Sequence, residues 1–288
     1  MIHNVPVERR TLHGHFSRDL PPILELDPGD SIVFSCPNAG WRLNAEETFE
    51  PRDQELDAGH ALIGPIAVRG ARSDATLVVH VDEVRPGAFG ETFGPDTRVE
   101  WTLDADAGTG TDDRGTTVRV APFLGVIGMP PEEPGIHSTG PPRRCGGNID
   151  CKELVAGTAL YLPISVDNAH VSAGDGHAAQ GDGELSGTAI ECYVERAQLT
   201  FELSDLELRS PVAHTADAWL AFGFDEDLDL AAEQAIGTML DLMERELEID
   251  RSYAIALGSV AVDLRVTQVV NGVKGVHAVL ERDAIRMG

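Results

Sequence analysis

The chain has 288 residues, enough for one large β unit or two modest domains, and its formal net charge is −26. An acidic surface repels nucleic acids and anionic membranes, so we expect neither as a partner. The first 20 residues lack the apolar core of a signal peptide, and no apolar run is long enough to span a membrane. We therefore expect a cytoplasmic protein.

The basic residues are unusual, because only two of the 22 are lysines, Lys152 and Lys274. High acidity with scarce lysine is typical of proteins adapted to concentrated salt, in which salt screens the repulsion between carboxylates. A GC-rich genome also replaces lysine by arginine. Halophily is the favoured hypothesis, and compositional drift is its alternative.

Short β-branched segments separated by turn residues fill most of the chain. We predict strands at residues 31–35, 76–81, 97–103, 116–120, 159–166, 188–194 and 198–203. Strands at this spacing without helices between them predict a mainly β fold, an antiparallel β-sandwich or barrel-like architecture. The aspartate- and glycine-rich segment 104–114 predicts a mobile surface loop. We expect residues 1–288 to form a single unit, with two β subdomains at about 1–120 and 121–288 as the alternative division, without a clear linker.

One helix is predicted over residues 228–247, in the C-terminal part of the chain, with Asp227 as its N-cap. Its apolar stripe recurs at three- and four-residue steps: Leu228, Ala232, Ala235, Ile236, Met239, Leu240, Met243 and Leu247. Residues 253–262 fit either a helix or a strand, and 264–270 fit a strand. The four cysteines form no Cys-x-x-Cys pair, so we expect reduced thiols and no structural zinc on the pair Cys145 and Cys151.

Residues 174–184 hold four glycines, three carboxylates and one imidazole. Glycine at this density is unfavourable inside a helix or strand, so we predict a shaped loop that aims its side chains at one point. Mixed oxygen and nitrogen donors suit a divalent cation such as zinc. We predict Asp175, His177 and Glu184 as metal ligands, with Asp182 as a weaker candidate, and a solvated acidic loop as the alternative.

Three further polar residues are candidates for catalysis. Glu191 interrupts the apolar segment 188–194, where a carboxylate is either functional or faces solvent on a half-exposed strand. We predict that Glu191 transfers protons. Asn148 and Asp150 follow a glycine pair and are predicted to orient a substrate amide or a second cation.

Several motifs resemble those of the acetamidase/formamidase family in order and spacing. They are His60–Ile66, Gly125–Gly128, Gly146–Asp150, Leu162–Ile164, Gly174–Glu184, Gly187–Glu191 and Val266–Asn271. The resemblance implies hydrolysis of a short aliphatic amide, of the formamide or acetamide class, by a metal-activated water. It also implies a homodimer or a higher homo-oligomer.

Histidines complete the comparison with this family. His15 and His60 match histidine positions of its N-terminal half, and we predict His60 and His137 as substrate-binding residues. Residues 36–43 depart from the family pattern, because an acidic residue is expected after the strand there.

Two other function classes compete with this prediction. Cys151 beside Lys152 suggests a nitrilase-type amidase, but that chemistry occurs on an alternating α/β chain, and too few helices are predicted here. The non-enzymatic alternative is a β-sandwich binding module with a structural cation, such as calcium, in the acidic glycine-rich loop. Calcium prefers oxygen ligands, so coordination by His177 would argue against that alternative.

Overall fold

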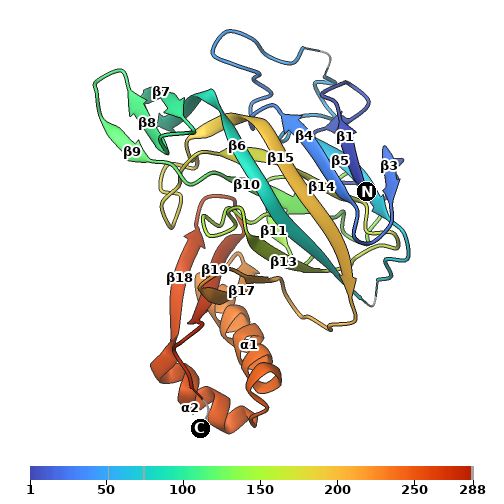
Figure 1. Cartoon of the computed structure of the whole chain (residues 1–288), viewed down its shortest axis with the longest axis vertical. Helices are drawn as coiled ribbons and strands as arrows, with labels where there is room; N and C mark the ends of the chain where they lie inside the picture. Colours follow the sequence, from blue (N-terminus) through green and yellow to red (C-terminus); the bar gives the residue numbers. More distant parts are fainter. Residues whose placement is uncertain (51, 74, 287–288) are drawn as a thin grey trace.

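A computed structural model describes residues 1–50, 52–73 and 75–286, and within them it confirms a mainly β fold with two helices near the C-terminus (Figure 1). A large curled sheet assembly forms the upper part of Figure 1, and a smaller layer carrying both helices lies below it. The strands before residue 130 are β1 (Ile2–Val5), β2 (Leu12–His13), β3 (Leu24–Leu26), β4 (Ser31–Cys36), β5 (Leu62–Val68), β6 (Thr76–Gly94), β7 (Thr97–Asp104), β8 (Thr109–Asp112), β9 (Thr117–Arg119) and β10 (Phe123–Gly128). The later elements are β11 (Pro142–Arg143), β12 (Gly146–Asn148), β13 (Thr158–Pro163), β14 (Val171–His177), β15 (Glu191–Ser204), β16 (Val212–His214), β17 (Ala218–Asp225), α1 (Leu228–Leu247), α2 (Arg251–Ala261), β18 (Val262–Gln268) and β19 (Lys274–Glu281).

The upper part consists of two groups of strands that enclose the main core. In the first group β15 pairs antiparallel with β6 on one side and β4 on the other, and β6 also pairs with β13. In the second group β14 pairs antiparallel with β10 and β5. Apolar side chains from both groups share one cluster, including Val79, Leu199, Ile63, Leu124 and Val171. This packing confirms the predicted sandwich or barrel-like architecture.

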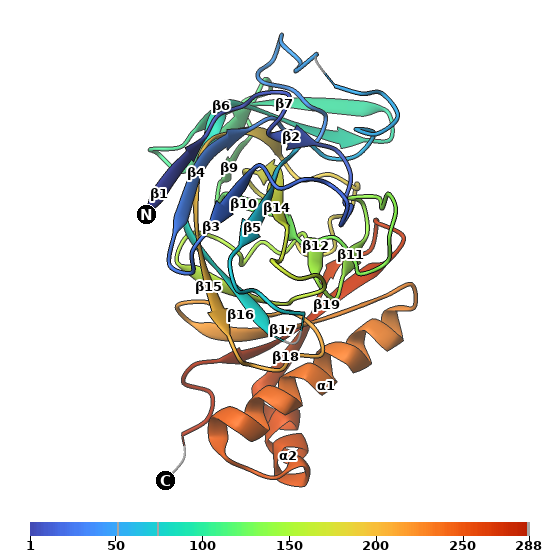
Figure 2. The same cartoon turned by 90° about the vertical axis from the view of Figure 1, so that its right-hand side faces the viewer.

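The lower layer is the antiparallel series β16-β17-β19-β18, with α1 packed against it (Figure 2). Asp227 caps α1 as predicted, since its carboxylate accepts hydrogen bonds from two backbone N–H groups of the first turn. Ala235, Met239 and Met243 are buried as predicted, whereas Leu228 and Ile236 are exposed. The buried face is rotated toward other residues of the helix, Ala231 and Leu242 among them. Residues 253–261 are helical and make up most of α2, and residue 262 begins β18.

The predicted mobile loop at 104–114 is wrong in part. Thr109–Asp112 forms β8, which pairs antiparallel with β7 and with β9, and the three strands project from the upper left of Figure 1. Threonine at alternate positions supplies the β-branched side chains that favour a strand, despite the flanking aspartates. The predicted strands 188–194 and 198–203 are one strand, β15, which begins only at Glu191 and is bent by register shifts between Val194 and Ala197.

The glycine-rich segment 174–184 was predicted to be a loop, and its first four residues are instead the end of the buried strand β14. A side chain at Gly174 would place its Cβ 2.3 Å from the Ala61 carbonyl oxygen, and one at Gly176 would lie 2.7 Å from the Cys192 carbonyl oxygen. Glycine is needed there because neighbouring strands approach closely. The loop itself begins after His177.

Strand pairing crosses residue 120 at several places, because β6 pairs with β13 and β15, and β5 pairs with β14. The division into subdomains at about 1–120 and 121–288 stays a prediction. In the described part of the chain, no helix combines the length and the apolar character needed to cross a membrane.

Candidate active site

The two groups of strands meet where β14 ends and β15 begins. His177, the last residue of β14, is the antiparallel partner of Glu191, the first residue of β15. Both side chains are buried. The pairing places an imidazole and a carboxylate at the same corner of the fold, although a loop of 13 residues separates them in the sequence.

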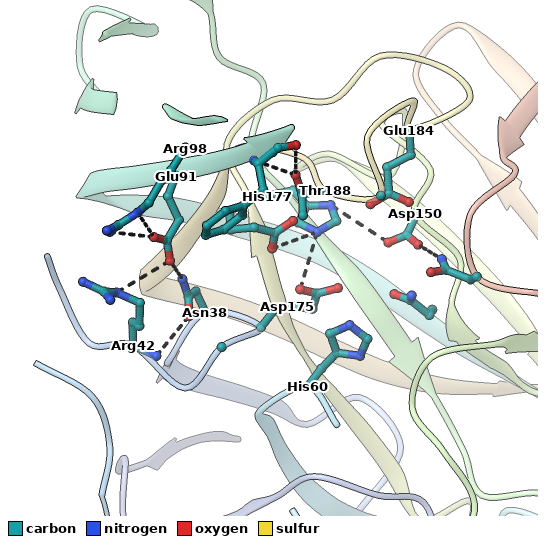
Figure 3. A pocket seen from close by; sticks show the side chains of 17 residues that line it. Asn38, Arg42, His60, Glu91, Arg98, Asp150, Asp175, His177, Glu184 and Thr188 are labelled. Atoms are coloured by element: carbon teal, nitrogen blue, oxygen red, sulfur yellow. Dashed lines mark hydrogen bonds and ion pairs between the residues drawn. The ribbon is translucent and has the colours of Figure 1, made fainter. Parts of the chain in front are cut away.

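Carboxylates surround the His177 ring on both sides (Figure 3). On one side Nε2 lies 3.4 Å from Asp175 Oδ1 and 3.4 Å from Glu191 Oε2. On the other side Nδ1 lies 4.0 Å from Asp150 Oδ1. The ring is held at right angles to Phe123, with ring centroids 5.0 Å apart. One imidazole therefore faces three buried carboxylates.

The backbone at this corner is strained in a way that aims the carboxylates. Asp150, Asp175 and Glu184 all have positive φ, at 54°, 61° and 47°. Left-handed backbone is unfavourable for residues with a Cβ, and such strain is concentrated at functional sites. A Cβ on Gly125 would lie 2.5 Å from Asp175 Oδ2 and 2.7 Å from Asp150 Oδ1, so only glycine leaves room for both groups.

The buried polar atoms at the centre lack hydrogen-bond partners. They are Asp150 Oδ1, Asp175 Oδ1, His177 Nδ1, Glu184 Oε2 and Glu191 Oε2. Burying a carboxylate oxygen without a hydrogen-bond partner is costly, because water no longer stabilises its charge. Oxygen donors in this number, with one imidazole, fit a divalent cation.

The donors fall into two groups that share His177. One group is Asp175, His177 and Glu191, and the other is Asp150, His177 and Glu184; within each, the donor atoms lie within 4.8 Å of one another. The sequence prediction combined Asp175, His177 and Glu184, which belong to different groups. Asp175 and Glu184, both predicted as ligands, therefore approach the same imidazole from opposite sides of its ring.

The surroundings shift the pKa values of the carboxyl groups at this site in opposite directions. Burial raises the pKa of Glu184 to about 7, and it raises the pKa of Asp150 well above its usual range. Burial acts to raise the pKa of Asp175, but the charges of His177 and His60 and hydrogen bonds with His177 and Glu191 together outweigh it and lower that pKa to about 2. Carboxyl groups with widely separated pKa values can divide the tasks of holding charge and of transferring protons.

These residues line a cavity of about 460 Å³, together with two other predicted residues, His60 and Asn148. The His60 ring and backbone N–H both contact Thr139 Oγ1 at 2.9 Å. Asn148 donates from Nδ2 to the Gly140 carbonyl, and its Oδ1 has no partner.

Two candidates from the sequence do not line the cavity. The His137 ring contacts the Glu133 carbonyl at 2.9 Å, in a segment bridged to Phe16. Asp182, the weaker metal candidate, instead forms a salt bridge of 2.8 Å with Lys152. The scarce lysine thus has a partner on the outer side of the loop.

The sequence did not reveal a second polar group in the cavity, centred on Glu91 of β6 (Figure 3). This buried carboxylate accepts hydrogen bonds from Asn38 and Arg98 and lies 3.6 Å from Arg42 Nε. Glu91 is also the register partner of Glu191. In the sequence, Glu91 is the acidic residue in the short segment from Gly90 to Phe93. A charge there could have pointed to a buried polar partner, since an apolar strand rarely holds an unpaired charge.

Comparisons with known proteins agree with this architecture. A model of the Acetamidase/Formamidase family matches residues 132–209, the segment that carries Asn148, Asp150, Asp175, His177 and Glu191. An acetamidase of Mycolicibacterium smegmatis is 25% identical, over 60% of this chain and 61% of its own length. A formamidase of Methylophilus methylotrophus is 26% identical, over 61% and 60%. The chain thus spans about three fifths of the length of these curated relatives.

Solved structures match over nearly the whole chain. A predicted acetamidase/formamidase from Thermoanaerobacter tengcongensis has a TM-score of 0.85 at 25% identity, covering 98% of this chain and 96% of its own. An acetamidase from Bacillus halodurans has a TM-score of 0.85 at 25% identity, covering 96% and 97%. The resemblance to the acetamidase/formamidase family, stated above from the sequence motifs, is confirmed.

Proposed function

We propose that this relative of acetamidases and formamidases is an amidohydrolase that converts a short linear amide to its carboxylate and ammonia. The observation that carries the proposal is the set of five unpartnered buried donor atoms around His177, beside a cavity of about 460 Å³. Such a set favours a cation, and amide hydrolysis is a reaction that a bound cation assists.

We assign the metal to the Nε2 side of His177, with Asp175 and Glu191 as the other ligands. Tetrahedral zinc with bonds of about 2.1 Å separates its nitrogen and oxygen donors by about 3.4 Å. The Nε2 atom lies 3.4 Å from a carboxylate oxygen of each residue. When bound, zinc would activate a water molecule and polarise the carbonyl of the amide.

Glu184 is then the residue that transfers protons. Burial raises its pKa to about 7 in the metal-free protein, which suits a group that accepts a proton from water and returns one to the departing ammonia. Asp150 is held beside it by Asn271 Nδ2, which donates to Asp150 Oδ2 at 2.7 Å. The roles of Glu184 and Glu191 are thus exchanged relative to the sequence prediction.

Asn148 and His60 suit the substrate amide. Asn148 Oδ1, buried and without a partner, can accept a hydrogen bond from the amide NH₂ group. Thr139 fixes the His60 ring at the cavity, where the nitrogen that does not contact Thr139 can reach the substrate. Both residues orient the amide and need not take a proton from it.

The exchange of roles can be tested with two isosteric variants, Glu184→Gln and Glu191→Gln. Each is purified, and its zinc content and ammonia release from formamide and acetamide are measured. We expect Glu191→Gln to lose zinc and activity together, whereas Glu184→Gln keeps zinc and loses about 10²- to 10⁴-fold in kcat. The opposite result would restore the assignment made from the sequence.

The metal requirement is tested separately by chelation and readdition. Chelator-treated protein should release no ammonia, and zinc should restore the activity. Full activity in metal-free protein would reject the mechanism. The alternative of a binding module with structural calcium is not favoured, because His177 belongs to both donor groups and calcium prefers oxygen ligands. A homodimer or higher homo-oligomer remains a prediction for light scattering.

A further inference from the structure

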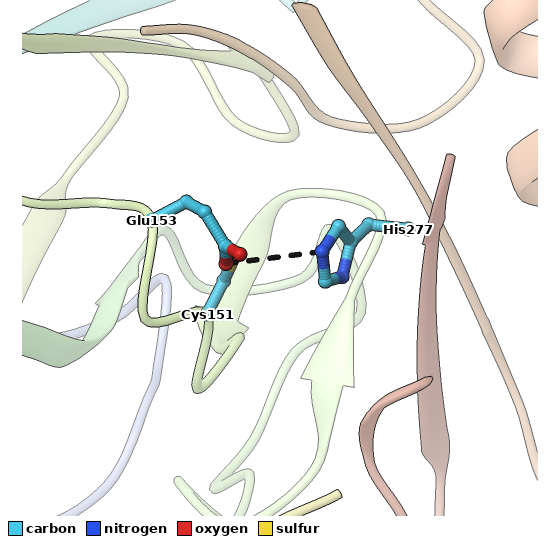
Figure 4. A group of neighbouring side chains, drawn as sticks. All are labelled: Cys151, Glu153 and His277. Atoms are coloured by element: carbon cyan, nitrogen blue, oxygen red, sulfur yellow. Dashed lines mark hydrogen bonds and ion pairs between the residues drawn. The ribbon is translucent and has the colours of Figure 1, made fainter. Parts of the chain in front are cut away.

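We propose a second, structural metal site, formed by Cys151, Glu153 and His277 (Figure 4). Cys151 and Glu153 lie in the turn after β12, and His277 lies on β19 of the lower layer. The sequence argued against a zinc on Cys145 and Cys151, and Cys145 is not part of this cluster. The new set joins residues that are far apart in the chain.

The donor atoms converge on one oxygen. Glu153 Oε2 lies 3.2 Å from Cys151 Sγ and 3.8 Å from His277 Nε2, and all three atoms lie within 4.8 Å of one another. Around a tetrahedral zinc, such donors are about 3.4 to 3.6 Å apart, given a zinc–sulfur bond of about 2.3 Å and bonds of about 2.1 Å to nitrogen and oxygen. The two distances from Glu153 Oε2 bracket this range, so small side-chain shifts would bring the donors to the spacing of a coordination shell.

The orientation of His277 points to a ligand. Its side chain is fully buried, and its Nε2 has no hydrogen-bond partner. Its Nδ1 contacts Thr267 Oγ1 at 2.8 Å. Metal-binding histidines show this arrangement, in which one ring nitrogen is held by a neighbour and the other is left free to bind. In Figure 4 the ring faces Glu153.

The Cys151 thiol donates a hydrogen bond to Glu153 Oε2, and loss of the thiol proton on metal binding would free both atoms. Arg265 donates to the other carboxylate oxygen, Glu153 Oε1, at 2.9 Å and so fixes the carboxylate without using Oε2. Glu153 and Arg265 also border a surface cavity of about 320 Å³, from which water can supply a fourth ligand. A cysteine, a histidine and a carboxylate suit zinc better than calcium or magnesium.

Binding would replace the proton on the Cys151 thiol by the metal and release that proton to solvent. The ion would then join the turn that follows Asp150 to strand β19. This is a structural role, distinct from the proposed chemistry at His177, and the two sites differ in that only the second contains a thiol.

The test uses cobalt as the probe, because a thiolate bound to Co²⁺ gives a charge-transfer absorption. The full chain is stripped with a chelator and titrated with Co²⁺. We expect the absorption in the wild type and in His177→Ala, and its loss in Cys151→Ser. Cys145→Ser is the matched control, since that thiol is buried and donates to a carbonyl oxygen outside the cluster. Cys192→Ser controls for the cysteine next to the first site.

Zinc content gives an independent measure, with one equivalent fewer per chain in Cys151→Ser than in the wild type. If Cys151→Ser fails to fold, Thr267→Val takes its place, with an expected loss of about 10- to 100-fold in cobalt affinity and an unchanged circular dichroism spectrum. No charge-transfer absorption in the cobalt-saturated wild type would overturn the proposal. So would an absorption that persists in Cys151→Ser.

Discussion

Two clusters of candidate metal ligands are adjacent in the chain, since Asp150 belongs to one and Cys151 to the other, yet their charges are balanced differently. The cluster around His177 holds four carboxylates and leaves five donor atoms without partners. In the Cys151 cluster, Arg265 and Thr267 already satisfy much of the polar surface. A bound cation would offset the negative charge of the first cluster, whereas in the second it would add stability to an arrangement whose polar groups are already largely paired.

The largest effect that this comparison predicts is on activity. His177→Ala should reduce ammonia release to the uncatalysed background, because it removes the donor common to both groups at the site. His277→Gln should lower the rate of ammonia release by less than about tenfold, which is below the usual loss for changes to residues that support a metal site without binding the metal. Initial rates on formamide and acetamide measure both. Comparable losses in the two variants would erase the distinction between a catalytic and a structural cluster.

Crowding at the first cluster predicts the next largest effect. In Gly125→Ala, the added Cβ would lie within 2.8 Å of atoms of Asp150, Asp175 and His177, so these donors must shift. Displacements of about 1 Å at a reacting centre cost about 10²-fold in rate. Gly181→Ala is the matched control, because a Cβ there meets no atom within 4 Å. Equal rates in the two variants would show that the geometry around Gly125 is not critical.

Some features of the fold and of the first cluster could be predicted from the sequence alone. Strand periodicity and the motif at 174–184 predicted the β architecture and the pairing of Asp175 with His177, because both signals are local. The side of the ring on which each carboxylate lies depends on left-handed backbone at Asp150 and Glu184, which no local pattern reveals.

Residues brought together by strand pairing were not accessible from the sequence. Glu91 reaches the cavity because β6 pairs with β15, and His277 lies beside Cys151 because the fold brings β19, which pairs with β17 and β18, to the turn after β12. Such contacts depend on register between distant segments, and a one-residue slip would reverse the side chains. Gly174 and Gly176 were wrongly taken as signs of a loop for the same reason. Glycine is needed at these positions because the backbone of a neighbouring strand lies close to them.

The pKa of Glu184 predicts an effect of intermediate size on metal-free protein. Because its folded pKa is raised from 4.5 to about 7, the folded state holds a proton that the unfolded state has lost between these values. Stability should therefore fall as pH rises from about 4.5 to 7, by about 3 kcal/mol at most. Urea unfolding at pH 5 to 8 should show this slope in the wild type and a flatter one in Glu184→Gln. An identical slope in both would assign the effect elsewhere.

The smallest difference between variants is expected from salt, because monovalent ions screen exposed charges and not buried ones. The chain carries 26 excess negative charges, and the Debye length falls from about 30 Å in 0.01 M salt to about 3 Å in 1 M. If the protein is adapted to salt, relief of surface repulsion should keep raising the melting temperature at salt concentrations well above the physiological one.

The carboxylates around His177 are buried, so KCl should raise the melting temperatures of wild type and Asp175→Ala in parallel, whereas zinc should raise only that of the wild type. Thermal unfolding from low salt to several molar KCl, with and without zinc, measures both effects. A curve that is flat above about 0.2 M would mean that the acidity is compositional drift. A steeper KCl response in the wild type than in Asp175→Ala would mean that monovalent ions reach the first cluster, and its charge imbalance would then not require a divalent cation.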